Sequence, residues 1–265
     1  MITNKKIVLT GASSGIGLEC LKLLAQGEGN EILAVSREAS KKMSGWGDNV
    51  TIFDADISTK EGVDAIFKKA EEMWDKIDIY YQNAGWPYYE VYDYEDWERT
   101  EKIYQTNVVG PAYTYVKYKH HLGGREGHLA FTVSAIGQMA MPGYALYSSS
   151  KFALEGFQQA IRLEMPKTMK LTCLYPVATD TNFFVTAADG IKFEKPFPVQ
   201  QPNVVARKMV AGIENDKKSV SPCPAFALSK VLMTACPPVR TVYWYLETQK
   251  LWRHKKHLEK LGISR

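Results

Sequence analysis

The sequence KIVLTGASSGIG, residues 6–17, decides the fold of this chain. It starts with a short apolar, β-branched run and continues into a turn that has glycines at positions 11, 15 and 17. Glycines allow a tight turn after a strand, and the N terminus of the helix that follows can hold a pyrophosphate. We therefore predict a dinucleotide-binding turn, with a purely structural turn as the alternative because the spacing differs from the commonest fingerprint. The predicted contacts are Gly11, Ser13, Ser14, Gly15, Ile16 and Gly17.

Apolar runs of strand length recur along the first two thirds of the chain, at residues 6–9, 31–35, 50–53, 77–81, 128–133 and 170–174. Segments of helix length lie between or beside them, at residues 15–26, 60–74, 97–119 and 147–165. This alternation is typical of a parallel sheet covered by helices on both faces. A chain of 265 residues, 45% of them hydrophobic, can bury one large core. The sequence predicts a doubly wound α/β fold in a single domain that spans residues 1–265.

The pattern changes after the last of these strands. Residues 182–201 contain several phenylalanines and two prolines without a helical or strand period, so we predict a long loop that covers the substrate. Residues 223–265 form a divergent basic C-terminal extension. Within it, residues 250–265 hold six basic residues against Glu259, a net charge of +5, whereas the whole chain carries +4 and the body therefore −1.

That charge distribution bears on the partners of the chain. A cationic excess confined to the tail argues against a nucleic-acid-binding face on the main domain. Trp244, Leu251, Leu258 and the lysines of the tail would make an amphipathic basic helix with weak contact to a membrane surface, and solvated charge is the alternative.

Targeting and metal signals are sparse. The sequence has neither a run of about 18 apolar residues nor a signal-peptide pattern, and we expect its first strand to belong to the fold. Cys20, Cys173, Cys223 and Cys236 make no Cys-x-x-Cys pair, which suits a reducing compartment and predicts a cytoplasmic protein. The histidines lack carboxylate or cysteine companions, so we predict no metal site.

The end of the second strand bears on the cofactor. NAD sites usually place an acidic residue about twenty positions beyond the glycines, whereas an NADP site needs cationic donors for the 2′-phosphate. Here that place holds Ser36 and Arg37, followed by Glu38. A guanidinium fork suits a phosphate, so the sequence favours NADP(H). The alternative is a solvated arginine at the start of the next helix.

Tyr147 and Lys151 stand four positions apart in a predicted helix, so both side chains project from one face. A tyrosine with a pKa of about 10 is a poor base near neutrality, but a neighbouring cation favours its phenolate and eases proton transfer. Such a pair also arises by chance, and its companions at the strand ends give it weight. Ser134 ends the fifth strand, Asn83, Ala84 and Gly85 follow the fourth, and Pro176 follows the sixth.

Together these motifs resemble the compact branch of the short-chain dehydrogenase/reductase family over residues 5–220. The resemblance implies a Rossmann-like fold and a homodimer or homotetramer paired through the helices around residues 100–120 and 147–165. It implies that Tyr147 is the general acid/base, that Ser134 hydrogen-bonds the substrate oxygen, and that Lys151 holds the nicotinamide ribose while lowering the tyrosine pKa. It also implies that Asn107 anchors a proton-relay water.

The resemblance assigns further cofactor contacts around the same edge of the sheet. Asp56 and Ile57 would meet the adenine, Asn83 would lie near the adenosine ribose with Ala84 and Gly85, and Thr179 and Thr181 would bind the carboxamide. Pro176 and Val177 would lie near the nicotinamide, although the family usually has glycine where this chain has Val177. For Asn83 and Asn107, a role in tying backbone segments together is the alternative.

The predicted function is that of an NADP(H)-dependent oxidoreductase that interconverts a ketone or aldehyde and an alcohol. The predicted substrate contacts are Trp86, Met141, Tyr144, Phe183 and Phe184, which fit a lipophilic, steroid-like or long-chain substrate. The alternative is that they are plain core residues, which is the commoner role of such side chains. A 3-oxoacyl-thioester reductase is one alternative, disfavoured because the chain lacks the Asp-Gly-Gly ending of such enzymes. An epimerase or a non-catalytic NADP(H)-binding regulator are the others.

Overall fold

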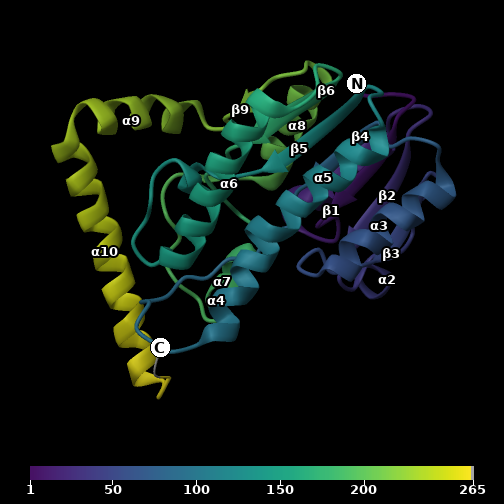
Figure 1. The fold of residues 1–265 in the computed structure, drawn as a ribbon. Coiled ribbons are helices and arrows are strands. Elements are labelled where there is room, and N and C mark those ends of the chain that lie inside the picture. Colours follow the sequence, from purple (N-terminus) through teal and green to yellow (C-terminus); the bar gives the residue numbers. More distant parts are fainter. Residues whose placement is uncertain (264–265) are drawn as a thin grey trace.

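The computed structural model describes residues 1–263, and in this part of the chain seven parallel strands form one central sheet (Figure 1). Their order is β3-β2-β1-β4-β5-β6-β9, so the strand order reverses beside β1 and the predicted doubly wound fold is confirmed. The strands are β1 Lys6–Thr10, β2 Glu31–Ser36, β3 Val50–Asp54, β4 Ile79–Gln82, β5 Gly127–Thr132, β6 Met169–Leu174 and β9 Ser219–Val220. The first six are the strands that the sequence predicts, with small shifts at their ends.

Helices α3, α5 and α6 cover one face of this sheet, and α1 and α8 cover the other. The α-helices of the described residues are α1 Gly15–Ala25, α2 Ala39–Lys42, α3 Lys60–Met73, α4 Trp97–Tyr104, α5 Gly110–Leu122, α6 Ala145–Glu164, α7 Phe183–Ala187, α8 Pro202–Glu214, α9 Pro224–Ala235 and α10 Pro237–Lys260. Strand β1 shows how the layers form, because Val8 packs with residues of α3, α5 and α6 whereas Ile7 and Leu9 pack with α1 and α8. Alternate residues of a parallel strand are thus buried on opposite faces, which explains its uninterrupted apolar sequence.

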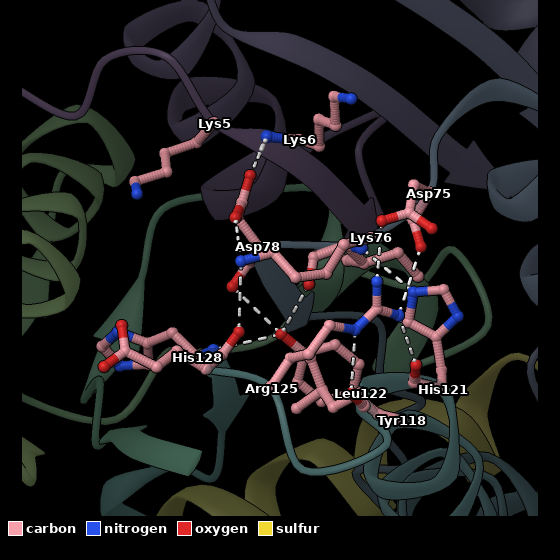
Figure 2. Close-up of polar contacts among 12 residues, drawn as sticks. Lys5, Lys6, Asp75, Lys76, Asp78, Tyr118, His121, Leu122, Arg125 and His128 are labelled. Carbon is pink, nitrogen blue, oxygen red and sulfur yellow. Dashed lines mark hydrogen bonds and ion pairs between the residues drawn. The ribbon is translucent and has the colours of Figure 1, made fainter. Parts of the chain in front are cut away.

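A polar network fixes the amino ends of the central strands (Figure 2). The Asp78 carboxylate accepts a hydrogen bond of 2.9 Å from the Lys6 backbone N–H. The Asp78 carbonyl accepts one of 2.9 Å from the His128 N–H and one of 3.0 Å from the Tyr118 hydroxyl. One aspartate therefore sets the relative positions of β1, β4 and β5, and with them the positions of their carboxyl ends.

Two predicted segments differ in detail from the structure. The helix predicted over residues 97–119 is interrupted by a π-helical turn, Gln105–Val109, between α4 and α5. The prediction of an unbroken loop over residues 182–201 was wrong. This segment contains α7 and the strand β8 Val199–Gln200, which pairs with β7 Ala178–Thr179. A five-residue helix is too short to show a 3.6-residue period, so the sequence pattern missed it.

The C-terminal extension forms two helices that meet at a corner away from the sheet (Figure 1). Leu251 and Leu258 of α10 are buried, and the Trp244 indole N–H donates a hydrogen bond of 2.8 Å to the Ala140 carbonyl. These three residues were predicted to form the membrane-facing side of an amphipathic helix. The structure instead places them on the side packed against the body, so that assignment of faces was wrong. Among the described residues, no helix is both long and apolar enough to cross a membrane.

The buried histidine of β5 gives the fold a predictable response to acid. The His128 ring lies 2.8 Å from the Thr172 hydroxyl, and burial lowers its pKa from 6.5 to about 4. As the pH falls below 6.5 the unfolded chain binds this proton before the folded one does. The stability from neutral His128 is therefore present above pH 6.5 and is lost between pH 6.5 and 4. We expect His128→Gln to remove on the order of 2 kcal/mol of that pH dependence, measured by urea unfolding at pH 7 and pH 5.

The exposed His120 supplies the matched control for this experiment. His120→Gln should leave the pH dependence of the wild type in place. An identical slope of stability against pH in His128→Gln and in the wild type would contradict the assignment.

Candidate functional site

The glycine turn after β1 is shaped by contact with the loop after β4. Gly11 has a φ of +69° and Gly15 a φ of +56°, values that L-residues with side chains rarely adopt. A Cβ on Gly11 would lie 2.8 Å from the Ala84 Cα, and a Cβ on Gly17 would lie 2.1 Å from the Gly11 carbonyl oxygen. The chain needs glycine at these positions because backbone occupies the space of a side chain.

Asn83, which follows β4, connects the carboxyl ends of β1, β4 and β5 through hydrogen bonds. Its side-chain amide N–H donates to the Gly11 carbonyl at 3.4 Å, and its side-chain oxygen accepts from the Thr132 hydroxyl at 3.0 Å. The Thr10 hydroxyl accepts hydrogen bonds of 3.2 Å from the Asn83 and Ala84 backbone N–H groups. The structural role for Asn83 is thus realised, and its predicted contact with a ribose stays a prediction.

Asn107 lies in the π-helical turn and is almost fully buried. Its side-chain oxygen accepts from the Trp86 backbone N–H at 2.8 Å, while its amide donates to the Trp86 carbonyl at 2.8 Å and to the Ser150 hydroxyl at 3.0 Å. A π-turn adds a residue to the helix and is frequent at functional sites. Here it directs an amide at the loop after β4 and joins that loop to α6. The predicted relay water at Asn107 stays a prediction.

Tyr147 and Lys151 lie in the first turns of α6, buried beneath the carboxyl end of β5. The Lys151 ammonium donates a hydrogen bond of 3.0 Å to the Thr132 carbonyl and stands 5.7 Å from the centre of the Tyr147 ring. Ser134, at the end of β5, has a φ of +127° and caps a short 3₁₀ turn through its hydroxyl. The structure therefore brings Ser134, Tyr147 and Lys151, three of the four residues predicted for catalysis, to one place.

Burial governs the titration of these groups. It raises the pKa of Tyr147 above its usual range, and a side-chain hydrogen bond with Ser134 acts in the opposite direction. Burial also lowers the pKa of the Lys151 ammonium to about 7. Both pKa shifts favour the uncharged form of the side chain, as expected when an ionisable group is removed from water. The two neutral forms are thus accessible near neutrality, and a protonated Tyr147 can donate its proton without first gaining one.

One pocket gathers these side chains at the carboxyl end of the sheet. Gly17 and Asn107 lie behind its wall, while the other predicted site residues line it. These lining residues are Gly11, Ser13, Ser14, Gly15, Ile16, Ser36, Arg37, Asp56, Ile57, Asn83, Ala84, Gly85, Trp86, Ser134, Met141, Tyr144, Tyr147, Lys151, Pro176, Val177, Thr179, Thr181, Phe183 and Phe184. Phe197, from the segment that was predicted to cover the substrate, also lines the pocket, and so do Lys42, Phe226 and Tyr243, which the sequence analysis did not predict. Phe226 and Tyr243 come from α9 and α10, whose arrangement no motif signals.

The end of the pocket beside β2 carries cations and an unsatisfied hydroxyl. The Arg37 guanidinium lies 4.5 Å from the centre of the Trp86 ring, and the Lys102 ammonium lies 4.2 Å from it. Within the described residues, the buried Ser36 hydroxyl has no hydrogen-bond partner. Trp86 thus lies beside Arg37, which was predicted to bind the cofactor, and the predicted contact of Trp86 with the substrate stays a prediction.

These features fit a dinucleotide. The turn from Gly11 to Ile16 lines the pocket at the N terminus of α1, where a pyrophosphate would be bound, and the Ser14 N-cap makes no side-chain capping bond there. The unpartnered Ser36 hydroxyl and Arg37 lie where a ribose and its substituent would be bound.

Comparison with known proteins identifies the family. Residues 5–191, well over half of the chain, match the family model described as short chain dehydrogenase. The chain therefore belongs to the short-chain dehydrogenase/reductase family of oxidoreductases, which act on carbonyl and alcohol groups.

Its relatives are distant. The chain is 28% identical over 244 residues to 3-ketodihydrosphingosine reductase of Dictyostelium discoideum, covering 81% of this chain and 73% of that protein. It is 29% identical to glycine betaine reductase ATRR of Emericella nidulans over 79% of this chain, which spans 17% of that longer protein. A short chain dehydrogenase from Burkholderia cenocepacia in complex with NADP superposes with a TM-score of 0.76 at 20% identity, covering 91% and 98% of the two chains.

The glycine contacts can be tested with two helical glycines. Alanine at Gly17 would place a Cβ 2.1 Å from the Gly11 carbonyl oxygen and 2.5 Å from the Asn83 amide nitrogen, so the turn must shift. We expect Gly17→Ala to lower the melting temperature, because the turn must move to make room for the Cβ. We also expect it to weaken NADPH binding at least about tenfold, which corresponds to a loss of about 1.4 kcal/mol of binding free energy from one displaced contact between the turn and the cofactor. Fluorescence titration and thermal unfolding measure both effects.

Gly156→Ala is the matched control, since a Cβ on this exposed glycine of α6 has nothing within 4 Å. It should leave NADPH binding unchanged, because the added Cβ contacts neither the glycine turn nor the pocket. Equal effects of the two substitutions would show that the turn tolerates a side chain.

Proposed function

We propose that this protein is an NADP(H)-dependent oxidoreductase that interconverts a lipophilic ketone or aldehyde and the corresponding alcohol. The observation that carries the proposal is the convergence of Ser134, Tyr147 and Lys151 with the glycine turn in one pocket. Membership of the short-chain dehydrogenase/reductase family supports the same chemistry.

When bound, the nicotinamide supplies or accepts a hydride. In reduction, the Tyr147 hydroxyl donates its proton to the substrate oxygen, and the Ser134 hydroxyl hydrogen-bonds that oxygen as negative charge develops on it. Lys151 lies on the same side of α6 as Tyr147, and its ammonium favours the phenolate that remains. In oxidation the same groups act in reverse, with Tyr147 as the base.

Three features support NADP(H) over NAD(H). Arg37 lines the pocket at the end of β2, and the buried Ser36 hydroxyl beside it needs an acceptor or donor. Lys42 lines the same end and supplies a second cation. The nearby carboxylate of Glu38 forms ion pairs of 2.8 Å with Lys42 and 3.5 Å with Lys41, so its charge is already balanced. A 2′-phosphate suits this excess of cationic donors.

The lining opposite the catalytic residues supports a lipophilic substrate. Phe183 packs edge-on against Tyr147 at a centroid distance of 5.4 Å, and Phe226 and Tyr243 reach the pocket from the C-terminal helices. Val177 packs with the cluster that contains Phe226, so the departure from the family's glycine adds apolar surface. The likeness to a 3-ketodihydrosphingosine reductase favours a long-chain ketone within this class.

We further propose that the chain forms a homodimer or homotetramer through α5 and α6. Val109 and Val116 expose apolar side chains at the start and on the surface of α5, and Phe152 and Leu163 do so on α6. Paired helices would bury these side chains, which a monomer leaves in water.

Replacing the catalytic phenol tests the reaction. Tyr147→Phe removes the transferable proton and keeps the ring that packs against Phe183, so we expect kcat to fall about 10²–10⁴-fold while NADPH affinity stays near that of the wild type. NADPH oxidation with a panel of long-chain, steroid and 3-oxoacyl ketones measures the rate. Wild-type NADPH binding without turnover of any ketone would favour a regulator, and an undiminished rate in Tyr147→Phe would exclude Tyr147 as the proton donor.

The cofactor preference has its own test. Arg37→Ala should weaken NADPH binding by about 10–100-fold and leave NADH binding unchanged, because a charged hydrogen bond is worth about 1.5–3 kcal/mol. Lys68→Ala removes one positive charge from the exposed side of α3, outside the lining of the pocket, and should change neither affinity. Equal losses for NADPH and NADH in Arg37→Ala, or wild-type preference for NADH, would contradict NADP(H) specificity.

A further inference from the structure

The outer side of the C-terminal helices exposes an apolar surface that the fold does not use. Six large apolar side chains on α9 and α10 are each between 52% and 75% exposed. They are Leu228, Val231, Leu232, Val242, Tyr245 and Leu246, which we call the outer apolar face. Members on each helix are three or four positions apart, so they form a continuous stripe. Figure 1 shows that the corner between α9 and α10 stands clear of the sheet.

Charges are nearly absent from this part of the chain. Residues 224–246 contain no acid, and their charged side chains are Lys230 and Arg240. The Lys230 ammonium turns inward and donates to the Gln138 side-chain oxygen at 2.9 Å, while the Arg240 guanidinium lies 4.8 Å from the centre of the Trp244 ring. Water therefore meets apolar atoms on both helices, an arrangement that marks an interaction site.

The second half of α10 is cationic. Arg253, Lys256 and Lys260 are exposed along it, with Arg253 in an ion pair of 2.8 Å with Glu194. The acids of this half are Glu247, which is buried beside Lys250 at 2.9 Å, and the exposed Glu259, so the exposed side keeps a net positive charge. Tyr245 and Trp252 are exposed near the transition from apolar to basic sequence. An apolar stripe, amphipathic aromatic rings and flanking cations are the combination that binds the boundary of an anionic bilayer.

A second copy of this chain fits the outer apolar face less well than a lipid surface does. Parallel pairing of two copies through α10 would bring their Arg253, Lys256 and Lys260 side chains together, and like charges repel. Antiparallel pairing would separate these side chains but would give them no partner of opposite charge on the apolar half of the other copy. Anionic headgroups neutralise the same side chains. Because neither helix can cross a bilayer, the geometry fits helices that lie on the membrane.

The inner side of the same two helices reaches the pocket. Phe226 of α9 is buried against Val177, and its ring and that of Tyr243 line the space that also holds Tyr147. A lipid-facing side and a pocket-facing side thus lie on opposite sides of one pair of helices. This arrangement would let an apolar molecule pass from a bilayer to the pocket without crossing bulk water.

We propose that the outer apolar face of α9 and α10 docks on an anionic membrane surface and that the substrate is a membrane-resident lipid ketone or alcohol. The second half of this statement rests on the proposed function. The docking itself does not, because it can be measured without turnover.

Vesicle co-sedimentation tests the docking. The full chain is mixed with vesicles of phosphatidylcholine alone or with phosphatidylglycerol added. We expect binding to the anionic vesicles, at least tenfold weaker binding for Leu228→Glu, and wild-type binding for Trp97→Glu. Leu228 is 75% exposed and Trp97 78% exposed, so the two variants add the same charge at equally exposed apolar positions on different surfaces.

Three results would overturn docking through this face. In the first, the wild type does not bind the vesicles. In the second, Leu228→Glu binds them as well as the wild type does. In the third, the wild type does not bind vesicles and light scattering shows that Leu228→Glu has a lower oligomeric mass than the wild type. The last result would identify the face as an interface between copies of this chain.

Turnover tests the substrate class separately. Leu228→Glu should keep the wild-type rate on a short water-soluble ketone and lose at least tenfold in rate on a long-chain ketone presented in anionic vesicles. Equal rates of the two proteins on the vesicle substrate would overturn delivery from the membrane. If the wild type reduces no ketone at all, the proposed function fails while co-sedimentation still decides the docking.

Discussion

The contact between the glycine turn and the loop after β4 is the constraint on which the rest of the structure depends. The Gly11 carbonyl accepts from the Asn83 amide, and the backbone at Ala84 lies where a Cβ on Gly11 would be. This packing brings the carboxyl ends of β1 and β4 together at the point where the strand order reverses. The pocket at this point is lined both by the N terminus of α1 and by Tyr147 and Lys151 of α6, so one ligand can contact both.

Burial rather than direct charge pairing sets the electrostatics of the catalytic group. The Lys151 ammonium donates a hydrogen bond to the Thr132 carbonyl, and its burial away from water lowers its pKa to about 7. The same desolvation keeps Tyr147 protonated. A Tyr147 phenol that is held protonated is suited to donate its proton to a carbonyl oxygen. An anion bound near Lys151 would favour the charged ammonium form of that lysine, and the ammonium in turn favours the Tyr147 phenolate.

Sequence patterns predicted what is local and periodic. The six strands, the turn from Gly11 to Gly17 and the pair on α6 could be predicted because each is encoded in a few neighbouring residues. The π-helical turn at Asn107 was not predictable, since its length depends on how the Asn107 amide meets the backbone of Trp86. The faces of α10 were assigned wrongly because Leu251 finds its partners in the cluster with Tyr89, far away in sequence. Contacts of that kind leave no periodic signal.

In the C-terminal extension, the position of each apolar residue along α10 decides whether it is buried or exposed, which the sequence pattern does not show. Leu251, His254 and Leu258 hold the end of α10 against the body, whereas Val242, Tyr245 and Leu246 near its start remain in water. The first half of α10 is also held in place, because the Trp244 indole donates to the Ala140 carbonyl and the Tyr243 hydroxyl donates to the Phe197 carbonyl. Its exposed apolar side chains therefore lie on the side of the helix that faces away from these contacts. The same two helices complete the wall of the pocket through Phe226 and Tyr243 and expose the outer apolar face. A change in how α9 and α10 pack would therefore alter the lining of the pocket and the exposed apolar surface together.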